Sequence, residues 1–245
     1  MTVGIRILGA ANNVQIDQNS SVAVVTERGS IGAANFNGEY GTFFFLGSRH
    51  HVIFAKPYTT QAPPLIFLKF NGPAPFGDAQ AISTFTMIGS PGNWTGFNLM
   101  VGRMNAAPYP AVTDMSWFAS TPTPQTPSGA KIGIRVRNPD TGLIVFESGW
   151  PIVKFLSQTA TFVPAGRYQG RHGTLRYTVG YPAGDVYFMA NGLSGIMDAS
   201  RRDNRYFWVG REGDFPGSLT IYTQGTDDIP YQDFLWTVLF ASPGL

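Results

Sequence analysis

The chain repeats its own opening. Gly4-Ile5-Arg6-Ile7 stands near the N-terminus, and Gly133-Ile134-Arg135-Val136 stands a little past the midpoint of the 245 residues. The ends of the two halves also agree, because Phe118-Ala119-Ser120 resembles Phe240-Ala241-Ser242. Matches in one order at a nearly constant offset are typical of an internal duplication whose period is far longer than a solenoid repeat. The sequence therefore predicts two similar halves.

A proline-rich segment separates these halves. Pro122, Pro124 and Pro127 alternate with small polar residues, which is typical of an extended, semi-rigid linker. We expect an N-terminal β-sandwich domain over residues 1–122, a linker over 123–128, and a C-terminal β-sandwich domain that repeats the first over 129–245. Each half has the length of a domain with a single core.

The composition favours strands over helices. The chain contains 29 Gly, 18 Pro and 19 Phe, and Gly and Pro interrupt helices, whereas aromatic residues suit a pleated surface. Short apolar segments recur with Gly and Pro between them, as in antiparallel sandwiches. Strands are expected at 42–46, 51–54, 65–70, 98–101, 115–119, 175–179, 186–189, 206–209, 218–222 and 234–240. The predicted fold class is all-β, with two tandem antiparallel β-sandwich domains that arise from an internal duplication.

Each half is predicted to begin with a β-hairpin. Apolar and polar residues alternate in residues 3–17 on either side of Asn12-Asn13, a pair that tolerates the positive φ of a tight turn. Residues 132–145 alternate in the same way around Asn138-Pro139-Asp140-Thr141-Gly142, a turn of different chemistry. The same local structure encoded by unlike turns favours a shared fold.

The charge and cysteine content restrict the function classes. Charged residues make up only 13% of the chain, about half the usual globular share, whereas a free monomer normally covers its surface with charge. We therefore expect partner proteins to cover much of the surface. A net charge of +2 does not indicate a polyanionic partner such as nucleic acid. The absence of cysteine excludes disulfides, thiolate metal sites and cysteine nucleophiles.

The N-terminus predicts no export. Residues 1–7 enter an alternating strand directly, without the basic and apolar regions of a secretory signal, and the apolar runs are too short to span a bilayer. We expect a soluble chain made in a cytoplasm.

The sequence offers no reactive constellation. Adjacent His50 and His51 point to opposite faces of a strand and cannot chelate one ion together, and His172 stands apart. Asp227-Asp228 is the one acidic pair, and its Gly- and Pro-flanked context indicates a turn. We predict no catalytic residues, no cofactor and no metal.

An arginine-rich, aromatic stretch is the main candidate contact surface. In residues 167–211, arginines stand beside aromatic rings, a combination that suits a protein interface, a sugar or single-stranded nucleic acid. A protein interface is the preferred interpretation, followed by a sugar. Nucleic acid comes last, because nearby aspartates and glutamates nearly cancel the positive charge that a phosphate groove needs. The candidate interface or glycan contacts are Trp94, Tyr109, Arg201, Arg202, Arg205, Tyr206 and Trp208.

The opening carries a resemblance to a known group of proteins. Gly4-Ile5-Arg6-Ile7, a small polar turn and the return strand Val14-Gln15-Ile16-Asp17 resemble the start of small tail-tip or tail-fibre-associated structural proteins of tailed bacteriophages. The aromatic-rich segments 115–119 and 238–241 resemble their closing strand. The resemblance implies a virion structural protein of β-sandwich type at the distal tail, with no catalytic residues to carry over. This chain departs from the group by carrying the opening twice.

Together these observations predict a non-enzymatic virion structural protein that acts in assembly of a bacteriophage tail tip or baseplate through protein–protein contacts. The expected partners are other virion structural proteins in a symmetric oligomeric assembly, with no nucleic acid and no membrane insertion. The expected location is the virion, after synthesis in the host bacterial cytoplasm. The alternative is a carbohydrate-binding module that recognises a host-surface glycan.

Overall fold

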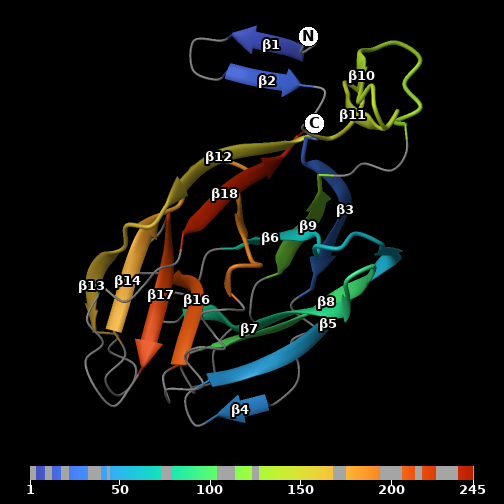
Figure 1. Ribbon diagram of the computed structural model, residues 1–245. Helices are drawn as coiled ribbons and strands as arrows, with labels where there is room; N and C mark the ends of the chain where they lie inside the picture. Colours follow the sequence, from blue (N-terminus) through green and yellow to red (C-terminus); the bar gives the residue numbers. More distant parts are fainter. Residues whose placement is uncertain are drawn as a thin grey trace.

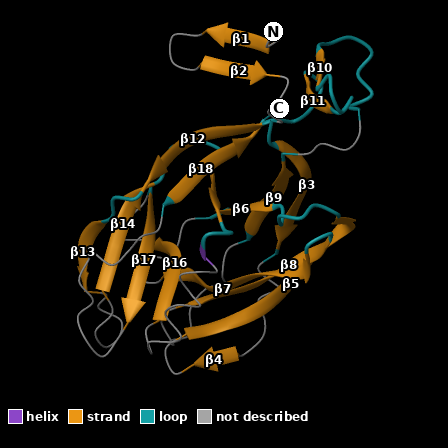
Figure 2. Ribbon diagram, viewed as in Figure 1, coloured by secondary structure: helices purple, strands orange, loops and turns teal. Residues whose placement is uncertain are grey.

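The computed structural model describes the chain as a series of β-strands joined by loops (Figures 1 and 2). The described residues are 4–8, 13–17, 22–32, 40–42, 45–72, 79–103, 114–122, 127–167, 175–193, 206–212, 217–224 and 237–244. The strands are β1 (Gly4–Leu8), β2 (Asn13–Asp17), β3 (Val24–Ile31), β4 (Tyr40–Thr42), β5 (Phe45–Tyr58), β6 (Leu65–Phe70), β7 (Ala79–Ser90), β8 (Asn93–Arg103), β9 (Met115–Thr121), β10 (Arg135–Arg137), β11 (Ile144–Glu147), β12 (Val153–Thr159), β13 (Val163–Arg167), β14 (Leu175–Gly180), β15 (Tyr187–Met189), β16 (Tyr206–Glu212), β17 (Ser218–Gln224) and β18 (Val238–Pro243). The all-β prediction is confirmed.

Two large antiparallel sheets make up the body. The six-stranded sheet has the order β12-β18-β15-β6-β9-β3, and the eight-stranded sheet has the order β13-β14-β17-β16-β7-β8-β5-β4. Two further pairs, β1 with β2 and β10 with β11, form separate two-stranded sheets at one end of the body, near the C-terminus (Figure 1). One buried cluster takes side chains from both large sheets, so the sheets pack face to face.

The strand order of each large sheet is mirrored about its centre. When every strand of the first half is replaced by the strand nine positions later, β3-β9-β6 becomes β12-β18-β15, and β4-β5-β8-β7 becomes β13-β14-β17-β16. The two halves therefore follow the same path through the two sheets. Both sheets are also continuous across the halves, so the described residues form one shared sandwich, and a division into two separately closed sandwiches is not confirmed.

The seam between the halves consists of strand pairs. In the six-stranded sheet β6 pairs with β15, with Leu68 opposite Phe188, and in the eight-stranded sheet β7 pairs with β16, with Ile82 opposite Val209. The side chain of Asn191 extends the first pair, because its Oδ1 accepts a hydrogen bond from the backbone N of Ile66 (2.6 Å) and its Nδ2 donates to the Pro64 carbonyl (2.9 Å).

The outer strands of the six-stranded sheet meet at one end. Val24 of β3 forms an isolated antiparallel bridge with Ile152, just before β12. On either side of this bridge the Val25 amide donates to the Pro151 carbonyl (2.7 Å) and the Val153 amide donates to the Ala23 carbonyl (2.9 Å). The bridge links the beginnings of β3 and β12, which are counterparts in the two halves.

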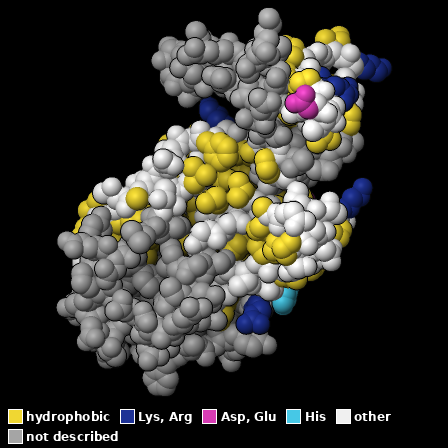
Figure 3. Space-filling view, viewed as in Figure 1, with side chains coloured by type: hydrophobic (Ala, Val, Ile, Leu, Met, Phe, Trp, Pro, Cys, Tyr) yellow, Lys and Arg dark blue, Asp and Glu magenta, His cyan; other side chains and the backbone are white. Residues whose placement is uncertain are grey.

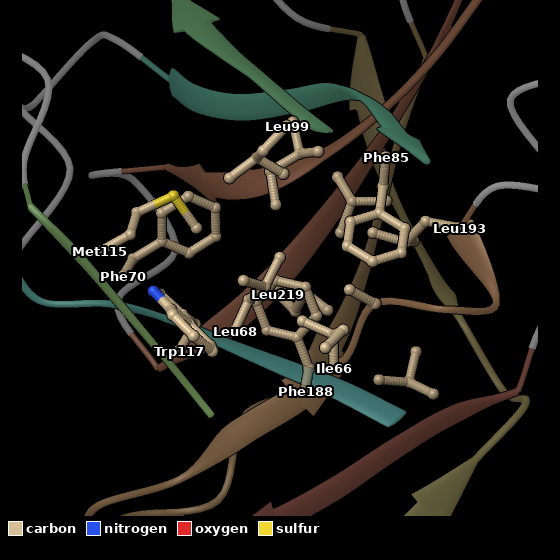
Figure 4. Close-up of a cluster of buried hydrophobic side chains, with 14 of the residues drawn as sticks. Ile66, Leu68, Phe70, Phe85, Leu99, Met115, Trp117, Phe188, Leu193 and Leu219 are labelled. Atoms are coloured by element: carbon tan, nitrogen blue, oxygen red, sulfur yellow. The ribbon is translucent and has the colours of Figure 1, made fainter. Parts of the chain in front are cut away.

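Aromatic and aliphatic side chains fill the space between the sheets (Figure 4). In Figure 4, Ile66, Leu68 and Trp117 of the six-stranded sheet face Phe85 and Leu99 of the eight-stranded sheet, and none of these five is more than 5% exposed. At about 25 cal/mol for each Å² of apolar surface removed from water, burial of such rings and branched chains is the main stabilising contribution.

A second apolar cluster lies on the other face of the six-stranded sheet. It contains Val25, Phe67, Phe118, Val153, Tyr187 and Ala241. The rings of Phe67 and Phe118 stack at 4.6 Å, and Phe155, which is 48% exposed, lies 6.3 Å from Phe67. Lys69 borders the cluster, pairing with Asp185 at 2.5 Å. This face therefore carries apolar side chains that are partly open to solvent.

Both predicted hairpins are confirmed. β1 pairs with β2 in register from Gly4 opposite Asp17 to Leu8 opposite Asn13. In the second hairpin the Asn138 side chain accepts from the amides of Asp140 and Thr141 at 2.9 Å, and Gly142 adopts a φ of 69°, which favours glycine. Local turn chemistry thus specifies the second hairpin. In the first, Asn13 of the predicted Asn12-Asn13 turn lies in β2 opposite Leu8, and residues 9–12 lie outside the described residues.

The buried face does not always follow the sequence alignment of the two halves. Phe118 and Phe240 are equivalent in the repeat, but Phe118 belongs to the outer cluster and Phe240 to the core between the sheets. A shift of one residue moves a strand's side chains to the opposite face. The sequence does not predict β7 as a strand. Its pairing with β8 shifts in register between Ile82 and Thr84. The shift places the buried residues Ile82 and Phe85 three positions apart, so the alternation of buried and exposed residues that marks a strand is lost.

Candidate functional site

A cleft opens between β3 and the end of β5. Its volume is about 450 Å³. The lining residues are Val24, Val25, Thr26, Glu27, Ala55, Lys56, Pro57, Tyr58, Thr59, Thr60, Thr121, Trp150 and Pro151. Because Trp150 and Pro151 lie in the segment that leads into β12, residues from both halves of the chain line the cleft.

An irregularity in β5 creates one wall of the cleft. Ile53 lies opposite Gly96 in β8, but the next paired residue, Tyr58, lies opposite Trp94, so β5 contains extra residues that β8 does not match. These residues bulge from the sheet towards β3. Pro57 is the one sequence signal for this feature, because proline is rarely accommodated inside a regular central strand.

Hydrogen bonds connect this bulge to β3. The Ala55 amide donates to Glu27 Oε1 at 3.0 Å. The Thr26 hydroxyl donates to the Ala119 carbonyl at 3.2 Å and lies 2.7 Å from the Tyr58 hydroxyl, so Tyr58 is the donor in that pair. Burial, with a smaller contribution from the Glu27 charge, raises the pKa of Tyr58, and the phenol remains neutral at physiological pH. The edges of the two large sheets are therefore fixed to each other at the cleft.

The cleft has the chemistry of a binding site. It combines apolar surface with threonine and tyrosine hydroxyls, one carboxylate from Glu27 and one ammonium from Lys56. No imidazole lines it, and no group of three or more histidines, aspartates or glutamates lies together within the described ranges. Its residues can hold a ligand by apolar contact and hydrogen bonding.

The two adjacent histidines lie in β5 outside the cleft. His50 is half-buried and His51 is exposed, as expected for successive residues of a strand. Burial, followed by the nearby His51, lowers the pKa of His50. His172 and Asp227-Asp228 lie outside the described residues.

The three predicted contact residues that the structure describes do not lie at one place. Trp94, the second residue of β8, pairs with Tyr58, and its indole Nε1 donates to the Thr60 carbonyl at 3.1 Å. Tyr58 and Thr60 both line the cleft. Tyr206 and Trp208 lie in β16, opposite Gln224 and Tyr222 of β17. β16 pairs with the beginning of β7, whereas Trp94 pairs with its end, so the two positions are separated by about 20 Å along the strand. Tyr109, Arg201, Arg202 and Arg205 lie outside the described residues.

The second hairpin presents large apolar side chains to solvent. Ile132 is 94% exposed, Leu143 is 60% exposed and Ile134 is 55% exposed. In Figure 3, hydrophobic and basic side chains lie together where Figure 1 places β10 and β11. We call Ile132, Ile134 and Leu143 the hairpin patch. Ile134 lies at the base of the hairpin, where its carbonyl accepts from the Ser148 amide, and Leu143 lies at the turn end, where its carbonyl accepts from the Asn138 amide. Exposed apolar surface of this kind is a candidate for contact with a partner.

An ion pair fixes the base of this hairpin. Arg135 of β10 contacts Glu147 of β11 at 2.8 Å, and the Glu147 carboxylate also accepts from the Ser128 hydroxyl at 2.9 Å and the Ser128 amide at 3.2 Å. The Arg135 hydrogen bond, assisted by Ser128, lowers the pKa of Glu147. Ser128 belongs to the predicted linker, so the hairpin is joined to the segment that leads into it.

Comparisons with known proteins identify no relative. No protein-family model matches the chain, and neither a curated protein nor a solved structure matches it. Within the described residues, no helix is long and apolar enough to cross a membrane.

Proposed function

We propose that this chain is a non-enzymatic structural protein that assembles with other proteins, and that it acts in a bacteriophage tail tip or baseplate. The observation that carries the assembly function is the hairpin patch, because three large apolar side chains that flank the strands of one small sheet are more than half exposed. Their contact with a partner would remove this surface from water. The placement in a phage tail rests on the resemblance of the opening hairpin alone.

The mirrored strand order supports a duplication as the origin of this architecture. A single ancestral half would contribute three strands to one sheet and four to the other, in the order that both halves keep. Two such units would pair through β6 and β7 as they now do with β15 and β16. Duplication would then give one chain two hairpins at the same end of the body, suited to two neighbouring contacts in a symmetric assembly.

The experiment measures assembly of the full chain. Ile132→Lys, Ile134→Lys and Leu143→Lys introduce charge into the hairpin patch, and Val163→Lys introduces the same charge at a 59% exposed valine in β13. In sedimentation velocity, we expect the natural chain and Val163→Lys to self-associate or to co-sediment with purified particles at a fixed copy number, and the patch variants to lose this association. A natural chain that stays monomeric and is absent from particles contradicts the proposal, and so does equal behaviour of all four variants.

The cleft favours a second candidate function, binding of a host-surface glycan. Its hydroxyl groups and the neighbouring Trp150 are of the type that hydrogen-bond and pack against sugars. A glycan-binding chain would bind isolated surface polysaccharide by itself, with Thr26→Val weakening that binding and the hairpin-patch variants leaving it unchanged. Failure of the natural chain to bind the polysaccharide rejects this candidate.

A further inference from the structure

Three hydroxyl groups of the cleft donate their protons within the protein. Tyr58 donates to Thr26 at 2.7 Å, and Thr26 donates to the Ala119 carbonyl at 3.2 Å. Thr60 donates to the Ala62 carbonyl at 2.6 Å. A hydroxyl group has one proton to donate but two lone pairs with which to accept. Towards a ligand in the cleft, these three hydroxyls therefore act as acceptors.

The cleft also contains one charged group of each sign. Glu27 Oε1 accepts from the Ala55 amide at 3.0 Å, which leaves the other carboxylate oxygen, Oε2, for a ligand. Within the described part of the chain, Glu27 and Lys56 form no ion pair with each other or with another residue. Because their charges cancel, the cleft as a whole is complementary neither to an anion nor to a cation.

These groups indicate an uncharged ligand that brings several hydrogen-bond donors. Ionised phosphate, sulfate and carboxylate groups bring acceptors alone, so they would leave the acceptors of Glu27, Thr26 and Tyr58 without partners. An ammonium group brings donors, but Lys56 repels it. Two adjacent hydroxyls of a sugar suit both charged groups, because one can donate to Glu27 while its neighbour accepts from Lys56.

The size and the apolar surface of the cleft also suit a sugar unit. The volume of about 450 Å³ lies within the range of about 300–1,000 Å³ that is usual for small-molecule sites. Pro57 and Pro151 line the cleft with C–H surface, against which the C–H groups of a sugar ring can pack. Thr59 is exposed, and its hydroxyl makes no hydrogen bond to another described residue, so it can donate to a ligand as well as accept.

We propose that the cleft binds an uncharged sugar unit through two adjacent hydroxyls, one held by the Glu27 carboxylate and the other by the Lys56 ammonium group. Thr26, Tyr58 and Thr59 bind further hydroxyls of the same unit. The inference rests on the second candidate function in placing a glycan in this cleft, and it goes further by naming the charge and the hydroxyl pattern of the sugar. Acidic sugars and amino sugars should bind less tightly.

The test uses the full chain and three uncharged probes, the methyl glycosides of glucose, galactose and mannose, which present adjacent hydroxyls in different stereochemistry. Saturation-transfer difference NMR measures their binding. We expect at least one probe to bind saturably, and its uronic acid and 2-amino counterparts to bind about tenfold more weakly or less, because each adds a charge that one group of the cleft repels.

Two variants connect this binding to the cleft. Glu27→Gln and Lys56→Met each remove one charge with little change in size, and each should lower the affinity about tenfold through loss of a hydrogen bond to a charged group. Glu27→Gln keeps an acceptor for the Ala55 amide, and Lys56 is exposed, so both variants should fold, which circular dichroism checks. Asp140→Asn and Lys154→Met make comparable changes at exposed residues outside the cleft and should leave the affinity unchanged.

The inference is overturned if none of the three probes binds, or if the uronic acid or the amino sugar binds as tightly as the uncharged probe. Unchanged affinity in Glu27→Gln and Lys56→Met, or equal loss in the two control variants, also overturns it. Binding of isolated surface polysaccharide is measured separately. Polysaccharide binding without probe binding rejects the inference alone, whereas probe binding without polysaccharide binding rejects the host-surface function alone. The hairpin-patch variants should bind the probe normally, so the assembly function is independent of both.

Discussion

Replacing Asn191 by alanine tests whether the two halves form one cooperative unit. The Asn191 side chain accepts from the Ile66 amide and donates to the Pro64 carbonyl, across the seam between β6 and β15. Ile66 is fully buried, so its amide would lose its partner without gaining water. An orphaned buried amide costs about 1–3 kcal/mol, and the second hydrogen bond contributes about 1 kcal/mol, so the variant should lose about 2–4 kcal/mol of unfolding free energy.

The matched control is Asn71→Ala. Asn71 is followed by glycine as Asn191 is, but within the described part of the chain its Oδ1 accepts from the Ser116 hydroxyl alone, at 2.9 Å in an exposed position. Loss of this bond should cost less than about 1 kcal/mol. Urea unfolding followed by tryptophan fluorescence and far-ultraviolet circular dichroism measures both variants.

The two halves should unfold in a single transition. Because one buried cluster takes side chains from both halves, the two probes should report one coincident transition, and Asn191→Ala should shift its midpoint by about 1 M urea for a slope near 3 kcal/mol per M. Two separate transitions, or equal stabilities of Asn191→Ala and Asn71→Ala, would show that the seam does not couple the halves.

Three further changes test the cleft and the hairpin. Gly96→Ala should abolish soluble expression, because an added Cβ would overlap the Val52 carbonyl in the neighbouring strand; normal yield would contradict the β5–β8 register. Tyr58→Phe should cost about 1 kcal/mol in urea unfolding through loss of the bond to Thr26, and no change would mean that the hydroxyl contact is not formed. Glu147 has a lowered pKa when folded, so its stabilisation is present above the unfolded pKa of about 4.3 and is lost as pH falls through the folded pKa. Unfolding measured between about pH 6 and pH 2 should therefore depend less on pH in Glu147→Gln than in the natural chain, and equal dependence would contradict the ion pair.

Local interactions explain what the sequence could predict. The turn at Asn138–Gly142 is specified by an asparagine side chain and a glycine with positive φ, both within the turn, and it forms as predicted. The side chains of residues 65–70 alternate between the core between the sheets and the cluster on the other face of the six-stranded sheet. The predicted bounds of this strand are those that the structure shows. All-β structure likewise follows from side chains that suit a pleated surface and from frequent Gly and Pro.

The candidate site shows why sequence alone was insufficient. Trp94 is a predicted contact residue because its side chain is aromatic, but its indole nitrogen donates a hydrogen bond to the Thr60 carbonyl. The cleft beside it depends on the bulge in β5 and on Trp150, which reaches it from the second half of the chain. A local sequence pattern cannot predict that these distant segments lie side by side, although Pro57 indicates the bulge.

The strand-rich class and the two hairpins could be predicted from the sequence, because they depend on neighbouring residues, on turn chemistry and on period-two alternation. The recurrence of similar segments is visible in the sequence directly. The tertiary structure alone decided that the halves share two continuous sheets, since the β6–β15 and β7–β16 pairs join residues more than a hundred positions apart. It also decided which face each strand buries, because a single bulge, as in β3 and β7, reverses the alternation beyond it.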